Sequence, residues 1–173
     1  MQIKPVKQLE VWRTFSDGKR CLVGRLAQNR QGVFFQYHPD YLASFANLSP
    51  FSLRFDSTLQ LGAREPHHGL HGAFADSLPD GWGLLLMDRV FRQAGILPTQ
   101  ITAMDRLAFV GASGVGALSY QPVSDLKQAD DSANISLAEI GLQAQAVFEG
   151  QTSEVLVALV NAGSSGGARP KAQ

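Results

Sequence analysis

The sequence has one cysteine, no excess of charge of either sign and no long apolar run. With Cys21 alone, no internal disulfide can form, which argues against a small secreted domain held together by disulfides. Fifteen basic residues balance fifteen acidic ones. The sequence therefore shows no excess of basic residues that would indicate direct nucleic-acid binding. The longest apolar runs, such as residues 84–87, are far shorter than the roughly twenty residues that span a bilayer. Residues 1–20 also lack an apolar signal segment, and we expect a soluble, cytoplasmic protein.

The first forty residues alternate apolar and polar side chains, which is the pattern of half-buried strands. Residues 8–15, 20–27 and 32–38 show this alternation, and polar, glycine-containing turns separate them. The spacing predicts an antiparallel meander, with Val11 and Phe34 on its inward face. Beyond the meander, we expect a helical turn over residues 40–45, a further strand over 51–55 and a loop over 56–73.

The segment 77–83, with the sequence Ser-Leu-Pro-Asp-Gly-Trp-Gly, marks the change from strand patterns to helix patterns. Pro79 and Asp80 favour the start of a helix, because proline needs no N–H partner in the first turn and aspartate complements the helix dipole. Gly95 favours its end. Apolar residues cover more than half of the circumference between these points and predict a buried helix. They are Trp82, Leu85, Leu86, Met87, Val90, Phe91 and Ala94.

The rest of the chain predicts shorter elements. Thr102 and Asp105 form a capping box, which indicates a short helix, and residues 117–120 are typical of a strand. Residues 123–135 are polar and predict an exposed linker, followed by helices over 136–148 and 152–163. A strand-rich half followed by a helix-rich half predicts an α+β fold, with an N-terminal antiparallel sheet packed on helices.

Three histidines, His67, His68 and His71, lie close together in the sequence and are potential metal ligands. Pro66 and Gly69 interrupt the helix that would align two of them on one face, and no cysteine is near. No metal site is therefore predicted, and the role of the histidines stays open.

Two glycine-rich segments resemble known motifs but lack the required context. Residues 111–116 do not have the G-x-G-x-x-G spacing, and a short helix rather than a strand is expected before them. Residues 163–167 match the G-x-S-x-G nucleophile elbow with Ser165 as the nucleophile. That elbow needs a strand before it, a helix after it and downstream Asp and His residues, and all of these are missing.

The segment 164–171 has the composition of a loop that wraps phosphate groups. Its small residues expose consecutive backbone N–H groups, and its basic residues add positive charge. The candidates are Ser164, Ser165, Gly166, Gly167, Ala168, Arg169 and Lys171. Pro170 stands where a Walker A loop has its second glycine, so the segment is not a Walker A loop. A flexible tail has a similar composition, and sequence chemistry alone leaves both interpretations open.

Four motifs follow one another along the chain: Ala75-Asp76-Ser77-Leu78-Pro79-Asp80-Gly81-Trp82-Gly83, Met87-Asp88-Arg89, Gly116-Ala117-Leu118 and the segment 164–171. Together they resemble the N-terminal region of HipA-like serine/threonine kinases, the toxins of type II toxin–antitoxin pairs. The resemblance implies a HipA-like N-terminal subdomain over residues 1–125 and the start of the kinase N-lobe over 126–173. It also implies that 164–171 is the glycine-rich loop over the ATP phosphates, with Ser164 as the autophosphorylated serine.

The same resemblance implies cofactors and partners. The complete kinase would use ATP and magnesium, would be restrained by a helix-turn-helix antitoxin of the HipB type and would phosphorylate a translation component such as a glutamyl-tRNA synthetase. The 173 residues stop before the family's strand lysine, catalytic aspartate and magnesium ligands, so we expect this chain alone to be a truncated, inactive fragment that binds no cofactor. The alternative is a stand-alone, antitoxin-like regulatory module that binds a separately encoded HipA-type kinase.

Overall fold

The computed structural model describes residues 4–79, 81–128 and 137–150, and the chain divides into two units. The first unit comprises residues 1–78 and 102–123, and the second comprises 79–101 and 124–173. The chain therefore passes between the units after residues 78, 101 and 123.

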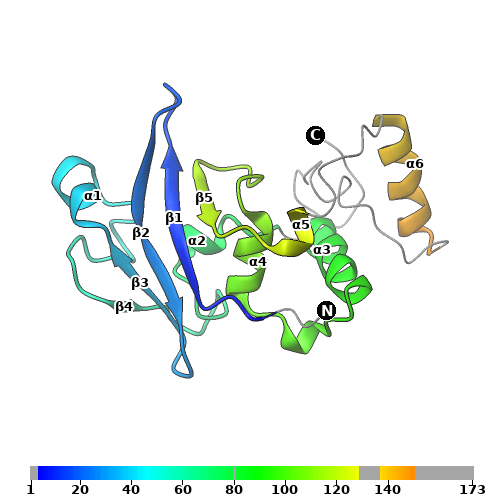
Figure 1. The fold of residues 1–173 in the computed structure, drawn as a ribbon, viewed down its shortest axis with the longest axis horizontal. Coiled ribbons are helices and arrows are strands. Elements are labelled where there is room, and N and C mark those ends of the chain that lie inside the picture. Colours follow the sequence, from blue (N-terminus) through cyan, green and yellow to red (C-terminus); the bar gives the residue numbers. More distant parts are fainter. Residues whose placement is uncertain (1–3, 80, 129–136, 151–173) are drawn as a thin grey trace. The chain divides into compact units, whose positions relative to one another are not determined.

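The first unit is built on a five-stranded antiparallel sheet with the order β4-β3-β2-β1-β5 (Figure 1). The predicted meander is confirmed as β1 (Gln8–Thr14), β2 (Arg20–Gln28) and β3 (Val33–Tyr37). β5 (Leu118–Gln121) is the strand expected over 117–120, and it pairs with β1. β4 (Gln60–Leu61) pairs with β3 and lies inside the segment that was expected to be a loop.

The β1–β2 pair contains a bulge, because its register shifts between Val11 and Trp12. Gly24 lies opposite Val11 at this irregularity. A Cβ atom on Gly24 would stand 2.1 Å from the carbonyl oxygen of Gln36 on the neighbouring strand. Only glycine fits this close approach of two backbones without a shift of the sheet.

The buried face of the sheet carries Val11, which is fully buried as predicted. Phe34 is not part of this core: it is partly exposed, whereas its neighbour Phe35 is fully buried. Successive side chains of a strand point to opposite faces, so the two phenylalanines cannot share one. The prediction for Phe34 is wrong because the run Val33-Phe34-Phe35 is apolar at every position and does not indicate which face is inward.

Three helices belong to the first unit: α1 (Pro39–Ser44), α2 (Gly72–Ala75) and α4 (Ala103–Val110). α1 confirms the helical turn expected near residues 40–45. α4 begins with the predicted capping box, in which the Thr102 hydroxyl accepts from the backbone N–H of Asp105 (3.1 Å) and the Asp105 carboxylate accepts from that of Thr102 (2.8 Å). α4 packs on β1 and β5 (Figure 1).

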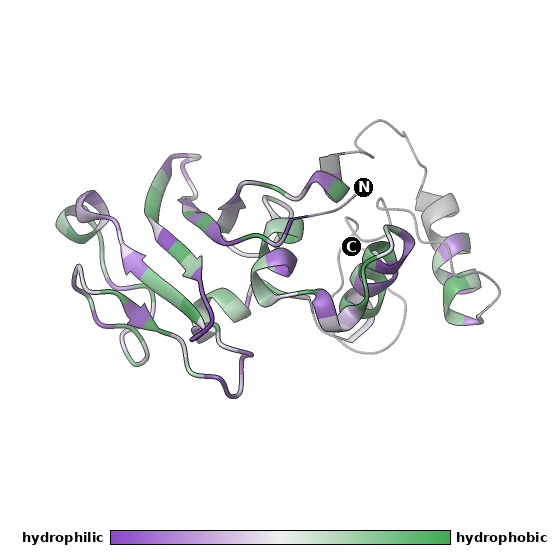
Figure 2. Ribbon diagram, turned by 60° about the horizontal axis from the view of Figure 1, so that its bottom comes forward, coloured by the Kyte–Doolittle hydropathy of each residue, from purple (hydrophilic) through white to green (hydrophobic). Residues whose placement is uncertain are grey.

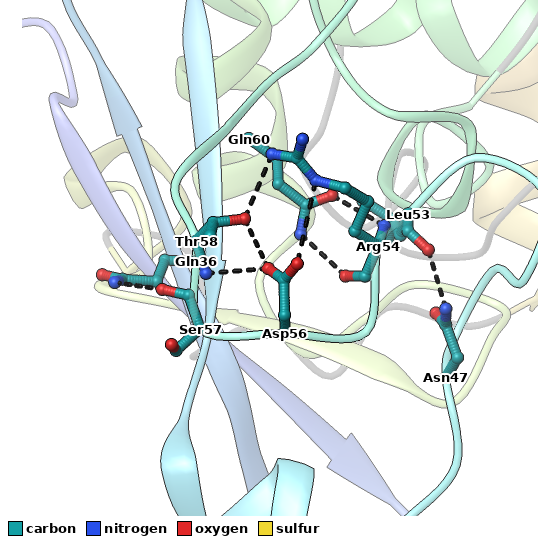
Figure 3. Close-up of polar contacts among 8 residues, drawn as sticks. All are labelled: Gln36, Asn47, Leu53, Arg54, Asp56, Ser57, Thr58 and Gln60. Carbon is teal, nitrogen blue, oxygen red and sulfur yellow. Dashed lines mark hydrogen bonds and ion pairs between the residues drawn. The ribbon is translucent and has the colours of Figure 1, made fainter.

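Residues 51–55 form turns rather than the expected strand. Side-chain amides organise this segment (Figure 3). The amide of Gln60 both donates to the backbone oxygen of Arg54 and accepts from its N–H, each at 2.8 Å, and Asn47 donates to the backbone oxygen of Leu53 at 2.7 Å. These bonds satisfy backbone groups that a strand would pair with a neighbouring strand. Residues 51–55 therefore form a loop despite their alternating pattern.

The second unit is helical in its described part. α3 (Gly81–Gln93) confirms the predicted central helix, and it carries both apolar and polar residues along its length (Figure 2). Trp82 and Leu86 are 3% and 1% exposed, as expected for a core helix. Leu85 is 41% exposed, so the buried stripe is narrower than the apolar stripe of the sequence.

The remaining elements of the second unit are η1 (Pro98–Gln100), α5 (Asp125–Gln128) and α6 (Leu137–Phe148). α5 interrupts the segment expected to be an exposed linker, and α6 matches the helix expected over 136–148. The helix expected over 152–163 lies outside the described residues. Across the ranges that the structure describes, no helix combines the length and the hydropathy that crossing a membrane requires.

Candidate functional site

The motif at residues 75–83 divides between the two units, and residues 75–78 end the first of the two chain segments that make up the first unit. Immediately after α2, the Ser77 hydroxyl lies 2.7 Å from the hydroxyl of Tyr120 on β5, within hydrogen-bond distance. Tyr120 is fully buried, and this burial raises the pKa of its hydroxyl far above the ordinary value. The phenol therefore stays protonated and neutral, and Ser77 ties the end of α2 to the sheet.

The second half of the motif begins α3. The Trp82 ring meets the ring of Phe148 edge-on, with 6.2 Å between centroids. Its indole Nε1 is buried and has no hydrogen-bond partner within the described ranges. In the next motif, Arg89 Nη1 donates to the backbone oxygen of Val147 at 3.4 Å. Both contacts join α3 to α6, while Asp80 lies outside the described residues.

The glycine-rich segment 111–116 links α4 to β5. Gly111 has a φ of +55°, a left-handed conformation suited to glycine, and its carbonyl oxygen accepts from the backbone N–H of Tyr120 at 3.0 Å. Ala117, in the third motif, accepts from the backbone N–H of Thr14 at 2.9 Å. A helix precedes this segment, as predicted, and its backbone groups serve the sheet, which argues for a structural connection rather than a dinucleotide loop.

The three histidines differ in their surroundings. His67 and His68 are exposed, whereas His71 is only 8% exposed and contacts the rings of Phe35 and Phe74. In the part of the chain that the structure describes, no group of three or more His, Cys, Asp or Glu side chains is placed to hold a metal ion. His71 is thus a core residue of the first unit.

The predicted phosphate-binding residues Ser164, Ser165, Gly166, Gly167, Ala168, Arg169 and Lys171 lie outside the described residues. Their assignment stays a prediction. The contacts described for the other motif residues, Ser77, Trp82, Arg89 and Ala117, join secondary-structure elements to one another.

Comparison with known protein families covers the first three of the four motifs, and the segment 164–171 lies outside the match. The family model for the HipA N-terminal domain matches residues 18–121, which are 104 of the 173 residues. The chain belongs to this family. A search of curated proteins and a search of solved structures each found no match.

The HipA N-terminal domain match begins at the turn between β1 and β2 and ends with β5. It therefore includes α3 and both halves of the 75–83 motif, and it draws on both units of this chain. β1 lies before the matched segment, yet it pairs with β2 on one side and β5 on the other. The HipA-like sheet of this protein is completed by residues that the match does not cover.

Proposed function

We propose that this chain is the N-terminal portion of a HipA-like toxin serine/threonine kinase. The observation that carries the proposal is the family match over residues 18–121. The order of the motifs supports it further, because a candidate phosphate-binding loop at 164–171 follows the matched segment. In this proposal the kinase phosphorylates a translation component such as a glutamyl-tRNA synthetase, and a DNA-binding antitoxin of the HipB type restrains it.

In this proposal the segment 164–171 covers the phosphates of ATP. Backbone N–H groups from Ser164 to Ala168 donate to phosphate oxygens, and Arg169 and Lys171 offset part of the negative charge. Magnesium would supply the remaining charge neutralisation in the complete kinase. A phosphate on Ser164 would bring about two negative charges into the same space and would compete with ATP.

The 173 residues contain no counterpart of the family's strand lysine, catalytic aspartate or magnesium ligands after the glycine-rich loop. These groups provide most of the electrostatic stabilisation of phosphoryl transfer. In this proposal phosphoryl transfer depends on these groups of the complete kinase. Its described part acts as a scaffold that carries the chain from the sheet through α3 toward the loop.

The second candidate is a stand-alone regulatory module that binds a separately encoded HipA-type kinase. It is favoured by one observation: the match is to the N-terminal domain of HipA, and it ends at residue 121. Such a module would restrain its kinase by binding, without nucleotide chemistry of its own.

The native gene product, purified from its source, distinguishes the two candidates. Its intact mass is measured first, and it is then incubated with magnesium and ATP labelled on the γ-phosphate. The kinase proposal predicts a mass well above 18.7 kDa and label on Ser164, which Ser164→Ala removes. A mass of 18.7 kDa, no label and stable association with a separate HipA-type kinase would instead establish the regulatory module.

A further inference from the structure

His71 is a buried histidine that lies among aromatic rings. Its side chain is 8% exposed and lies against two aromatic rings, with 6.4 Å to the ring centroid of Phe35 and 6.1 Å to that of Phe74. Its Nδ1 atom is buried and makes no hydrogen bond within the described ranges. The site accommodates a flat, neutral ring and offers nothing that would compensate a charge.

The elements that pack against His71 supply no counter-charge. β3 has the sequence Val-Phe-Phe-Gln-Tyr and α2 the sequence Gly-Ala-Phe-Ala. Their one titratable side chain is Tyr37, whose phenol stays neutral because burial raises its pKa to about 12. In the adjoining turns, Arg64, Glu65 and Asp76 are exposed, and no ion pair joins them to His71 in the described part of the chain. His67 also lies near α2, with its Nε2 3.5 Å from the position of a Cβ built on Gly72.

The backbone of His71 starts α2. Its carbonyl oxygen accepts from the N–H groups of Phe74 (2.9 Å) and Ala75 (3.1 Å), and the Ser77 N–H donates to the oxygen of Phe74 (3.1 Å). A displacement of the His71 backbone would remove the acceptor of the first two bonds and, through Phe74, disturb the bond that holds the Ser77 N–H.

We propose that His71 is an acid-sensitive switch for the segment 71–77. The neutral imidazole holds the segment closed against Phe35 and Phe74. The protonated imidazolium leaves this apolar site for water, and α2 opens with it. The segment contains the first residues of the 75–83 motif, so acid loosens the start of the connection from the first unit into α3.

The direction of the pH effect follows from burial, which lowers the pKa of His71 in the closed form. The open form binds its proton with the ordinary affinity of about pKa 6.5. The closed form is therefore fully favoured above that pH and loses stability as the pH falls through the range between the ordinary and the lowered pKa. Because one proton is taken up, each pH unit in that range favours opening by at most about tenfold.

Hydrogen exchange of backbone amides, measured by NMR on the 173-residue chain, tests this switch. Protection factors of the Phe74, Ala75, Asp76 and Ser77 amides are compared at pH 7.5 and 5.5, after correction for the intrinsic exchange rates. We expect a fall of up to about tenfold in the wild type, no fall in His71→Leu and the wild-type fall in the control His67→Gln. An equal fall in His71→Leu would overturn the proposal.

The imidazole signals supply a second readout, which needs no variant at position 71. Assigned Cε1 proton shifts give the pKa of each histidine in the folded wild type. We expect the pKa of His71 to lie below the ordinary histidine value of about 6.5. A pKa for His71 at or above that ordinary value would also overturn the proposal, even if His71→Leu failed to fold.

Discussion

The hydrogen bond between Ser77 and Tyr120 is the contact that fixes the end of α2 on the sheet. Tyr120 is fully buried and Ser77 is half-buried, so the two hydroxyls have unequal access to water. Ser77→Ala leaves the Tyr120 hydroxyl buried without a partner and should lower the free energy of unfolding by about 1–3 kcal/mol. Tyr120→Phe leaves only the Ser77 hydroxyl, which can reach water, and should cost about 0.5–1.5 kcal/mol.

Urea denaturation of the two single variants and the double variant measures these differences. The expected order is that Ser77→Ala lowers the midpoint more than Tyr120→Phe, and that the double variant resembles Tyr120→Phe. A larger effect of Tyr120→Phe, or additive effects of the two changes, would show that the hydroxyls do not act as a pair.

The Ser77–Tyr120 contact was beyond prediction from the sequence. The two residues are 43 positions apart, and neither belongs to a local pattern such as a cap or a turn. By contrast, the pairing of Thr102 with Asp105 was predicted, because both partners lie within one helical turn and their spacing is set by the helix itself. Local hydrogen bonds leave a signature in the sequence, whereas bonds that depend on the fold do not.

Two neighbouring phenylalanines on β3 show which face of the sheet packs in the core. Phe35 is fully buried and Phe34 is partly exposed on the opposite face. Phe35→Ala should therefore lower the free energy of unfolding by about 3–5 kcal/mol, because it leaves a large cavity. Phe34→Ala is the matched control and should cost about 1 kcal/mol. Equal midpoints for the two variants, measured by chemical denaturation, would contradict the assigned face.

α3 offers a second matched pair, since Leu85 and Leu86 are chemically identical neighbours on one helix. Leu86 is 1% exposed, and Leu86→Ala should destabilise the protein by about 2–5 kcal/mol. Leu85 is 41% exposed, and Leu85→Ala should cost about 1 kcal/mol or less. Helix propensity changes equally in both variants, so the difference between their denaturation midpoints reports burial alone. An unchanged midpoint for Leu86→Ala would show that α3 is peripheral.

Several of the elements that the sequence predicted correctly have periodic patterns and clear ends. The first three strands, α3 and α4 have both, whereas residues 51–55 alternate over a short stretch only. There the outcome is decided by Gln60 and Asn47, whose amides bind the backbone of the loop (Figure 3). A polar side chain that satisfies a distant backbone group has the same sequence signature as one exposed to water, so periodicity could not reveal this loop.

The chain runs from the sheet of the first unit into α3 of the second unit and then returns to the first unit. The 75–83 motif lies where the chain first passes from one unit to the other. Motif resemblance identified the family, and the family match over residues 18–121 confirms it. The division after residues 78, 101 and 123 was not predicted, because the HipA-like motifs fix the order of elements and not their grouping in space. The phosphate-binding role of the segment 164–171 stays a prediction from sequence chemistry and family resemblance.

The central claim is that the segment 164–171 of a HipA-like kinase binds the phosphates of ATP. Magnesium-ATP is titrated against three proteins: the 173-residue chain, the full native gene product and the full product carrying Ser164→Asp. We expect binding by the full native product alone, because in the proposed function the complete kinase supplies further groups that hold ATP, and the aspartate places negative charge where the ATP phosphates would bind. Equal affinity in all three proteins would contradict it and would leave the function resting on the N-terminal domain match.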